Sequence, residues 1–250
     1  NGVITPAISI LSAVEGILLI PGLENLSQST LIITASIIAI LLFVIQKRGT
    51  ERIAGAYGPI MLVWFLVLSL SGILAIYEAP MVFKALNPYY GFKFLAVNGF
   101  AGFLLLNEVI LCATGGEALY SDLGHMGRIS IVNAWHFVFA ALLLNYFGQG
   151  AFLIIHPSAK NLLFEMIFNQ AQFLYIPFLL LSIAATIIAS QAMISGMFSM
   201  VYQGITTHVI PLLKVDYTSQ EMRGQIYIGF VNWFLLAFVI FIMYEFKESK

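Results

Sequence analysis

The sequence predicts an all-α membrane protein that crosses the bilayer several times, and three observations lead to this class. Sixty per cent of the 250 residues are hydrophobic and only 9% are charged, too few charged groups to cover a water-soluble domain. Seven apolar stretches are long enough to cross a hydrocarbon core of about 30 Å, for which a helix needs about 20 residues. None of them alternates polar and apolar residues at every second position, as the strands of a membrane barrel do.

The predicted spans belong to one transmembrane domain that covers residues 1–250. We place them at residues 3–20, 30–45, 59–77, 97–119, 132–155, 174–200 and 226–246. The chain has no initiator methionine and opens directly at the start of an apolar helix. We therefore expect a partial domain, cut from a longer polypeptide.

The first span carries a stripe of small and polar residues on an otherwise apolar helix. Its members recur at spacings of four, four, three and four, which places them on one helical face: Asn1, Thr5, Ser9, Ser12 and Gly16. Such a stripe alone is typical of close helix packing. However, Glu15 lies beside it, and an acid within a span is costly enough to suggest a functional role. The stripe is thus a candidate lining for a polar site.

The fourth span contains a second acid, Glu117, directly after the paired glycines Gly115 and Gly116. Paired glycines favour unwinding of a helix, which frees backbone carbonyls near the middle of the membrane. An ion that sheds its water shell needs such oxygens. We therefore predict a discontinuous helix near Thr114 and Glu117.

Four amides in the later spans have two interpretations that the sequence leaves open. Each either hydrogen-bonds a neighbouring helix or lines a cavity, and the four are Asn145, Gln149, Gln191 and Asn232.

Several other classes of protein are excluded or disfavoured. The formal net charge is -1 and the basic residues form no run, so we expect no nucleic-acid partner. The lone Cys112 has no partner for a disulfide or a metal cage. No metalloprotease, serine-hydrolase or P-loop motif occurs, so we expect neither an enzyme nor a bound cofactor.

Five segments, in chain order, resemble successive spans of the KUP/HAK/KT potassium uptake permeases. They match the third, sixth, seventh, eighth and ninth spans of that family and lie at residues 1–16, 113–125, 144–151, 189–196 and 224–233. Matches in this order are far more specific than chance similarity among apolar sequences.

The resemblance implies a LeuT-like, inverted-repeat secondary transporter of the plasma membrane that takes up potassium together with protons. The chain then corresponds to family spans three to nine. In this architecture the broken first span faces the broken sixth, so part of the ion site is expected in the remaining spans of the parent protein. The sequence leaves the oligomeric state open, a homodimer included.

The resemblance also implies roles for individual residues. The potassium ligands implied are Thr5, Ser9 and Thr114, whose neutral oxygens suit a large, weakly hydrated cation. Glu117 and Glu15 match acids implicated in proton coupling or in stabilising the charge of the ion. The candidates for lining the cavity are Asn1, Ser12, Gln149 and Gln191. Asn1 departs from the family pattern, which often has Asp, and an amide cannot carry the transported proton.

Two rival functions remain open from the sequence. A related transporter for an amino acid or another organic solute would share the fold, because the fold does not determine the substrate. A transport-inactive membrane fragment or scaffold is the second alternative, although acids beside helix breaks would then have no use.

Overall fold

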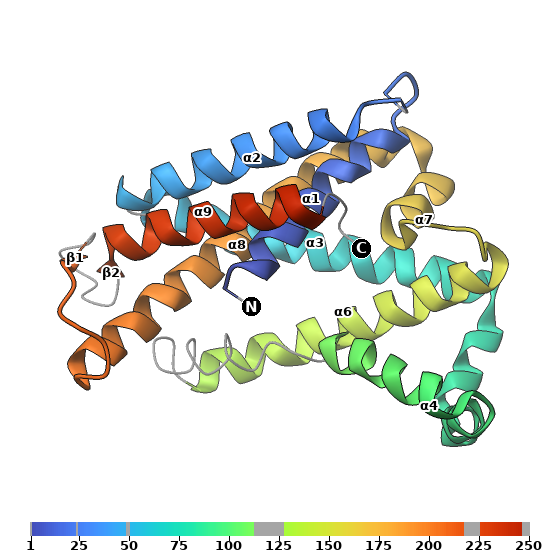
Figure 1. Ribbon diagram of the computed structural model, residues 1–250. Helices are drawn as coiled ribbons and strands as arrows, with labels where there is room; N and C mark the ends of the chain where they lie inside the picture. Colours follow the sequence, from blue (N-terminus) through green and yellow to red (C-terminus); the bar gives the residue numbers. More distant parts are fainter. Residues whose placement is uncertain (1, 24, 49–50, 113–127, 218–225, 247–250) are drawn as a thin grey trace. The chain divides into compact units, whose positions relative to one another are not determined.

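The computed structural model describes residues 2–23, 25–48, 51–112, 128–217 and 226–246. They form helices almost throughout (Figure 1), namely α1 (Ile4–Glu15), α2 (Gln28–Ile45), α3 (Glu51–Glu78), α4 (Pro88–Cys112), α6 (Arg128–Ile155), α7 (Leu162–Gln170), α8 (Tyr175–Thr206) and α9 (Gly229–Phe246). Short 3-10 helices join them: η1 (Gly16–Leu19), η2 (Gln46–Arg48), η3 (Pro80–Leu86) and η4 (Gln172–Leu174). A two-residue antiparallel ladder pairs β1 (Asp216–Tyr217) with β2 (Ile226–Tyr227).

The chain divides into two compact units. The first contains Asn1–Phe65 and Ile167–Lys250, and the second contains Leu66–Met166. Each unit has an apolar core of its own, described separately below.

In the first unit, α1 packs against α2, α8 and α9 (Figure 1). The buried side of α1 consists of small and branched apolar side chains, among them Ala7, Ile10, Leu11 and Val14, which join the core of this unit. Helix α2 begins after Ser27, whose hydroxyl accepts a hydrogen bond from the Thr30 backbone N–H at 3.3 Å and so caps the helix.

In the second unit, α3 and α6 approach each other at two glycines. A Cβ atom added to Gly148 would lie 2.4 Å from Cα of Gly72, and one added to Gly72 would lie 2.3 Å from the Leu144 carbonyl oxygen. Ala75 and Ala151 are buried in the same core. Only small residues permit such close contact between helix backbones.

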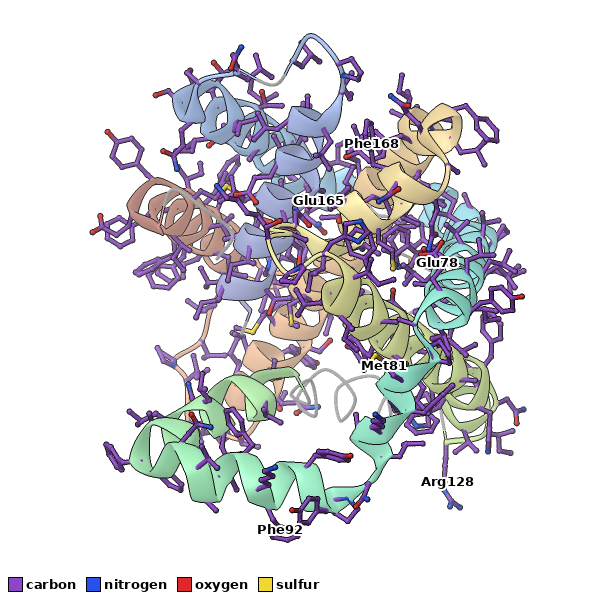
Figure 2. The ribbon with its side chains drawn as sticks, turned by 90° about the vertical axis from the view of Figure 1, so that its right-hand side faces the viewer. Glu78, Met81, Phe92, Arg128, Glu165 and Phe168 are labelled. Atoms are coloured by element: carbon purple, nitrogen blue, oxygen red, sulfur yellow. The ribbon has the colours of Figure 1, made fainter. Side chains whose placement is uncertain are left out.

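Helix α4 is interrupted at Gly99, whose φ of 50° and ψ of −126° are not helical. The two segments that it separates lean towards each other, because residues on both sides line one apolar groove of about 450 Å³, including Phe92, Leu95 and Leu105. Figure 2 labels Phe92 on the first segment and Met81 on the preceding η3.

Within the described residues, five helices are long and apolar enough to cross a membrane, compared with the seven spans predicted. Two further apolar helices, Ile4–Leu19 and Gly229–Glu245, are shorter. At 1.5 Å per residue they rise about 24–26 Å, less than the roughly 30 Å of a hydrocarbon core. The predicted class, an all-α polytopic membrane protein, is confirmed.

Some connections differ from what the sequence suggested. The sequence predicts a connection at residues 78–96 between the third and fourth spans, but η3 and the first segment of α4 make most of these residues helical. The connection after α6 also contains the unpredicted α7, whose first turn is closed by Glu165 (labelled in Figure 2). Its carboxylate accepts hydrogen bonds from the backbone N–H groups of Lys160 and Asn161 at 2.8 and 2.9 Å. Local capping of this kind stabilises a short helix that hydrophobicity alone does not reveal.

Candidate functional site

Four of the predicted site residues, Thr5, Ser9, Ser12 and Glu15, lie on α1. Thr114, predicted to bind the ion, Glu117, predicted to couple protons or stabilise charge, and Asn1, predicted to line the cavity, lie outside the described residues. The described structure therefore presents one wall of the candidate site, and the predicted discontinuity near Thr114 stays a prediction.

This wall is the side of α1 that the other helices of the first unit leave uncovered. Thr5 is exposed, and Ser9, Ser12 and Glu15 are half-buried, whereas Ala7 and Val14 on the opposite side are at most 1% exposed. The helical period places residues at spacings of four and three on one face, so the hydroxyls follow one line along the helix.

The hydroxyls of Thr5 and Ser9 have no hydrogen-bond partner within the part of the chain that the structure describes. Hydroxyls in a helix commonly bond to the carbonyl one turn earlier, as Thr34 does to Thr30 at 2.8 Å in α2. The Ser9 hydroxyl makes no such bond among the described residues, so its oxygen is available to a ligand, whereas the residue one turn before Thr5 lies outside them. The wall therefore offers neutral oxygen donors beside one carboxylate.

The donors are not those of a typical transition-metal or zinc site. No group of three His, Cys, Asp or Glu side chains that could hold a metal ion occurs among the described residues. Neutral hydroxyl oxygens are weak ligands that suit a large monovalent cation, which must bind reversibly to be transported.

Gln191 on α8 pairs reciprocally with Gln46 at the end of α2. The amide nitrogen of each donates to the amide oxygen of the other, the bond from Gln191 to Gln46 measuring 2.9 Å, and both side chains are 5% exposed. The geometry of Gln191 is that of an interhelical hydrogen bond, which is one of the two interpretations that the sequence leaves open. Gln46 was missed because it lies just past the predicted end of its span.

Asn232 of α9 also contacts the end of α2. Its side-chain nitrogen donates to the Phe43 carbonyl oxygen at 3.2 Å, and the residue is fully buried. Gln149 and Asn145 lie on α6 in the second unit, where Gln149 is half-buried and Asn145 is buried. The lining role predicted for Gln149 stays a prediction, because Gln149 and α1 belong to different units.

Tyr227 precedes α9 and has a perturbed hydroxyl. Burial raises its pKa, and the negative charge of Asp216 raises it further. A phenol is neutral near pH 7 even at its ordinary pKa of about 10, and the raised pKa keeps Tyr227 neutral over a wider pH range, so it is unsuited to exchanging a transported proton.

Comparison with known proteins agrees with oxygen ligands that suit a monovalent cation. The family model for the K+ potassium transporter integral membrane domain matches residues 1–250. A probable potassium transport system protein Kup of Trichlorobacter lovleyi is 64% identical over 250 residues, covering 100% of this chain and 41% of that protein. The corresponding protein of Methanosarcina barkeri is 63% identical over 250 residues, covering 100% of this chain and 42% of its own length.

A probable potassium transport system protein Kup of Methanosarcina acetivorans is 61% identical over 249 residues, covering 100% of this chain and 41% of that protein. The chain thus spans about two fifths of the length of the curated relatives that it matches. No solved structure matches the chain significantly.

Proposed function

The chain belongs to the K+ potassium transporter family, and from this membership we propose that it is part of a multi-pass membrane protein that takes up potassium ions together with protons. The plasma membrane is the expected location, with apolar helix faces towards the lipid. The family is one of transporters, so the chain is not an enzyme.

The observation that carries this proposal is the uncovered hydroxyl wall of α1. Thr5 and Ser9 lie one turn apart, and their oxygens are unused by the described part of the protein. Potassium is large and weakly hydrated, so neutral oxygens replace its water shell without binding it too tightly to leave. An organic solute with a carboxylate would instead need a charged or dipolar partner, and the described wall carries an acid, Glu15.

The remaining parts of the site are proposed from the family resemblance. Thr114 supplies a third ligand at a break in a LeuT-like fold, and Glu117, one turn later, takes up the transported proton. A glutamate partly removed from water holds its proton more strongly, so protonation and ion occupancy compete. Glu15, near the end of α1, is the second acid assigned to coupling or charge stabilisation.

Uptake of rubidium, a close mimic of potassium, tests the ligand assignment. In cells that lack other potassium systems, we expect Thr5→Val in the full-length protein to raise the KM for rubidium roughly tenfold, the effect of losing about 1.4 kcal/mol of binding. Thr34→Val is the matched control, because its hydroxyl bonds to its own helix in α2. Absence of uptake by the unmodified protein would remove the proposed function, and equal KM values for both variants would remove Thr5 from the site.

The proton-coupling part has a separate test. Glu117→Gln keeps the size and hydrogen-bonding capacity of the side chain but fixes it in a neutral state. We expect slower uptake that depends less on external pH, measured in cells that contain normal amounts of the variant in the membrane. Unchanged rate and pH dependence would show that Glu117 does not couple protons.

A further inference from the structure

Tyr175, the first residue of α8, connects this helix to the end of α1. Its hydroxyl donates a hydrogen bond of 2.5 Å to the Gly16 carbonyl oxygen, across 159 positions of sequence but within the first unit. The side chain is only 2% exposed. Separating a buried hydroxyl from its hydrogen-bond partner costs free energy, so this bond strongly favours one arrangement of α1 and α8.

Aromatic neighbours hold the Tyr175 ring in place. Phe168 of α7 meets it edge-on at 5.2 Å between ring centroids, and Phe178, one turn along α8, lies at 6.5 Å. Trp64 stacks on Phe178 at 5.6 Å. Because the ring is packed on several sides, the direction of its hydroxyl is set by this cluster.

The accepting carbonyl lies where α1 changes its geometry. The α-helix ends at Glu15, Gly16 begins the 3-10 helix η1, and the Ile20 N–H bonds to the Ile17 carbonyl at 3.0 Å. The end of α1 is therefore anchored at one defined residue of the chain.

Anchoring one residue of a helix determines where all the others point. A shift of α1 by one residue would move it about 1.5 Å along its axis and turn its side chains by about 100°. A shift in one direction would bring Thr5 and Ser9 to the places of Pro6 and Ile10, which are buried in the packed core. A shift in the other direction would bring them to the places of Ile4 and Ile8, which are exposed, and so would change where the hydroxyls lie on the uncovered face. Gly16 lies about 16 Å along the axis from Thr5, too far for Tyr175 to contact an ion bound there.

We propose that Tyr175 is a positioning residue for the potassium site, acting through its hydrogen bond to Gly16 on the register and rotation of α1. This inference rests on the proposed function, in which Thr5 and Ser9 bind the ion. The local sequence around Tyr175 does not predict this role, because a tyrosine near the end of a span is typical of the membrane interface.

Removing the hydroxyl alone tests the inference. Tyr175→Phe keeps the ring and its packing, so we expect normal amounts of protein in the membrane and an unchanged maximal rate of rubidium uptake. The KM should rise roughly three- to tenfold, the range expected for one lost buried hydrogen bond. Tyr244→Phe on α9 is the matched control, since that side chain is 69% exposed and should leave KM unchanged.

A second measurement follows the position of α1 independently of transport. In the full-length protein with Cys112 and any further cysteines replaced by serine, Ser9→Cys provides one thiol on the stripe. Its rate of labelling by a water-soluble thiol reagent is measured in membranes. Adding Tyr175→Phe should change this rate at least threefold, whereas adding Tyr244→Phe should not.

The outcomes separate the two proposals. If the unmodified protein takes up no rubidium but Tyr175→Phe still changes the labelling, the proposed function fails and the anchoring of α1 stands. If uptake occurs and Tyr175→Phe matches Tyr244→Phe in both KM and labelling, the positioning role is overturned. A Tyr175→Phe protein absent from the membrane would also overturn it, because the hydroxyl would then be required for folding.

Discussion

Substituting alanine at Gly148 should separate α3 from α6. The added Cβ would lie 2.4 Å from Cα of Gly72, whereas carbon atoms in contact lie about 3.5–4.0 Å apart. The obstructing atoms belong to the backbone, so no side chain can rotate away and the helices themselves must move by about 1 Å. Overpacking of a buried contact typically costs about 1–3 kcal/mol.

Gly55→Ala is the control, because Gly55 is exposed on α3 with no atom within 4 Å of an added Cβ. There alanine removes a flexible residue from a helix and gains up to about 1 kcal/mol. The two substitutions should therefore differ by about 1–4 kcal/mol, Gly148→Ala being the less stable.

Melting of the purified full-length protein in detergent, followed by the loss of its monodisperse chromatographic peak, measures this difference. Gly72→Ala should behave like Gly148→Ala, and the double variant should cost less than the sum, because one displacement relieves both contacts. A Gly148→Ala protein that melts at the temperature of Gly55→Ala would refute the close approach of the two helices.

Three further substitutions test particular residues by the same melting assay. Gly99→Ala should destabilise the protein by about 1–3 kcal/mol, because φ at Gly99 is 50°. Gly91→Ala is the control and should not destabilise it, because Gly91 has an ordinary φ and open space around it. Equal melting temperatures for the two variants would contradict the break in α4. Gln191→Leu should cost about 1–3 kcal/mol, because it leaves the buried Gln46 amide unpaired. Replacing both Gln191 and Gln46 by leucine should recover much of this loss of stability. Purely additive effects of the two substitutions would argue against the pair. His208→Gly should raise the melting temperature by relieving about 1 kcal/mol of left-handed strain at φ 58°, and a lower value would show that the histidine side chain contributes more than the strain costs.

The sequence by itself determined the class of this protein and the location of its polar stripe. Composition and the length of apolar runs suffice for a membrane helix, because every backbone polar group must be satisfied within its own segment. The helical period likewise places Thr5, Ser9 and Ser12 on one face without reference to any other part of the chain. Ordered family motifs predicted the family to which the chain belongs.

Only the tertiary structure decided which face of α1 remains uncovered and which polar groups meet. Periodicity shows that a helix has a polar side but not which helices pack against the other side. The amide of Gln191 bonds to Gln46 and the hydroxyl of Tyr175 bonds to Gly16, partners 145 and 159 positions away. Gly72 likewise differs from Gly55 only through the backbone that packs against it. Such contacts depend on the packing of distant segments, a property that no local stretch of sequence contains.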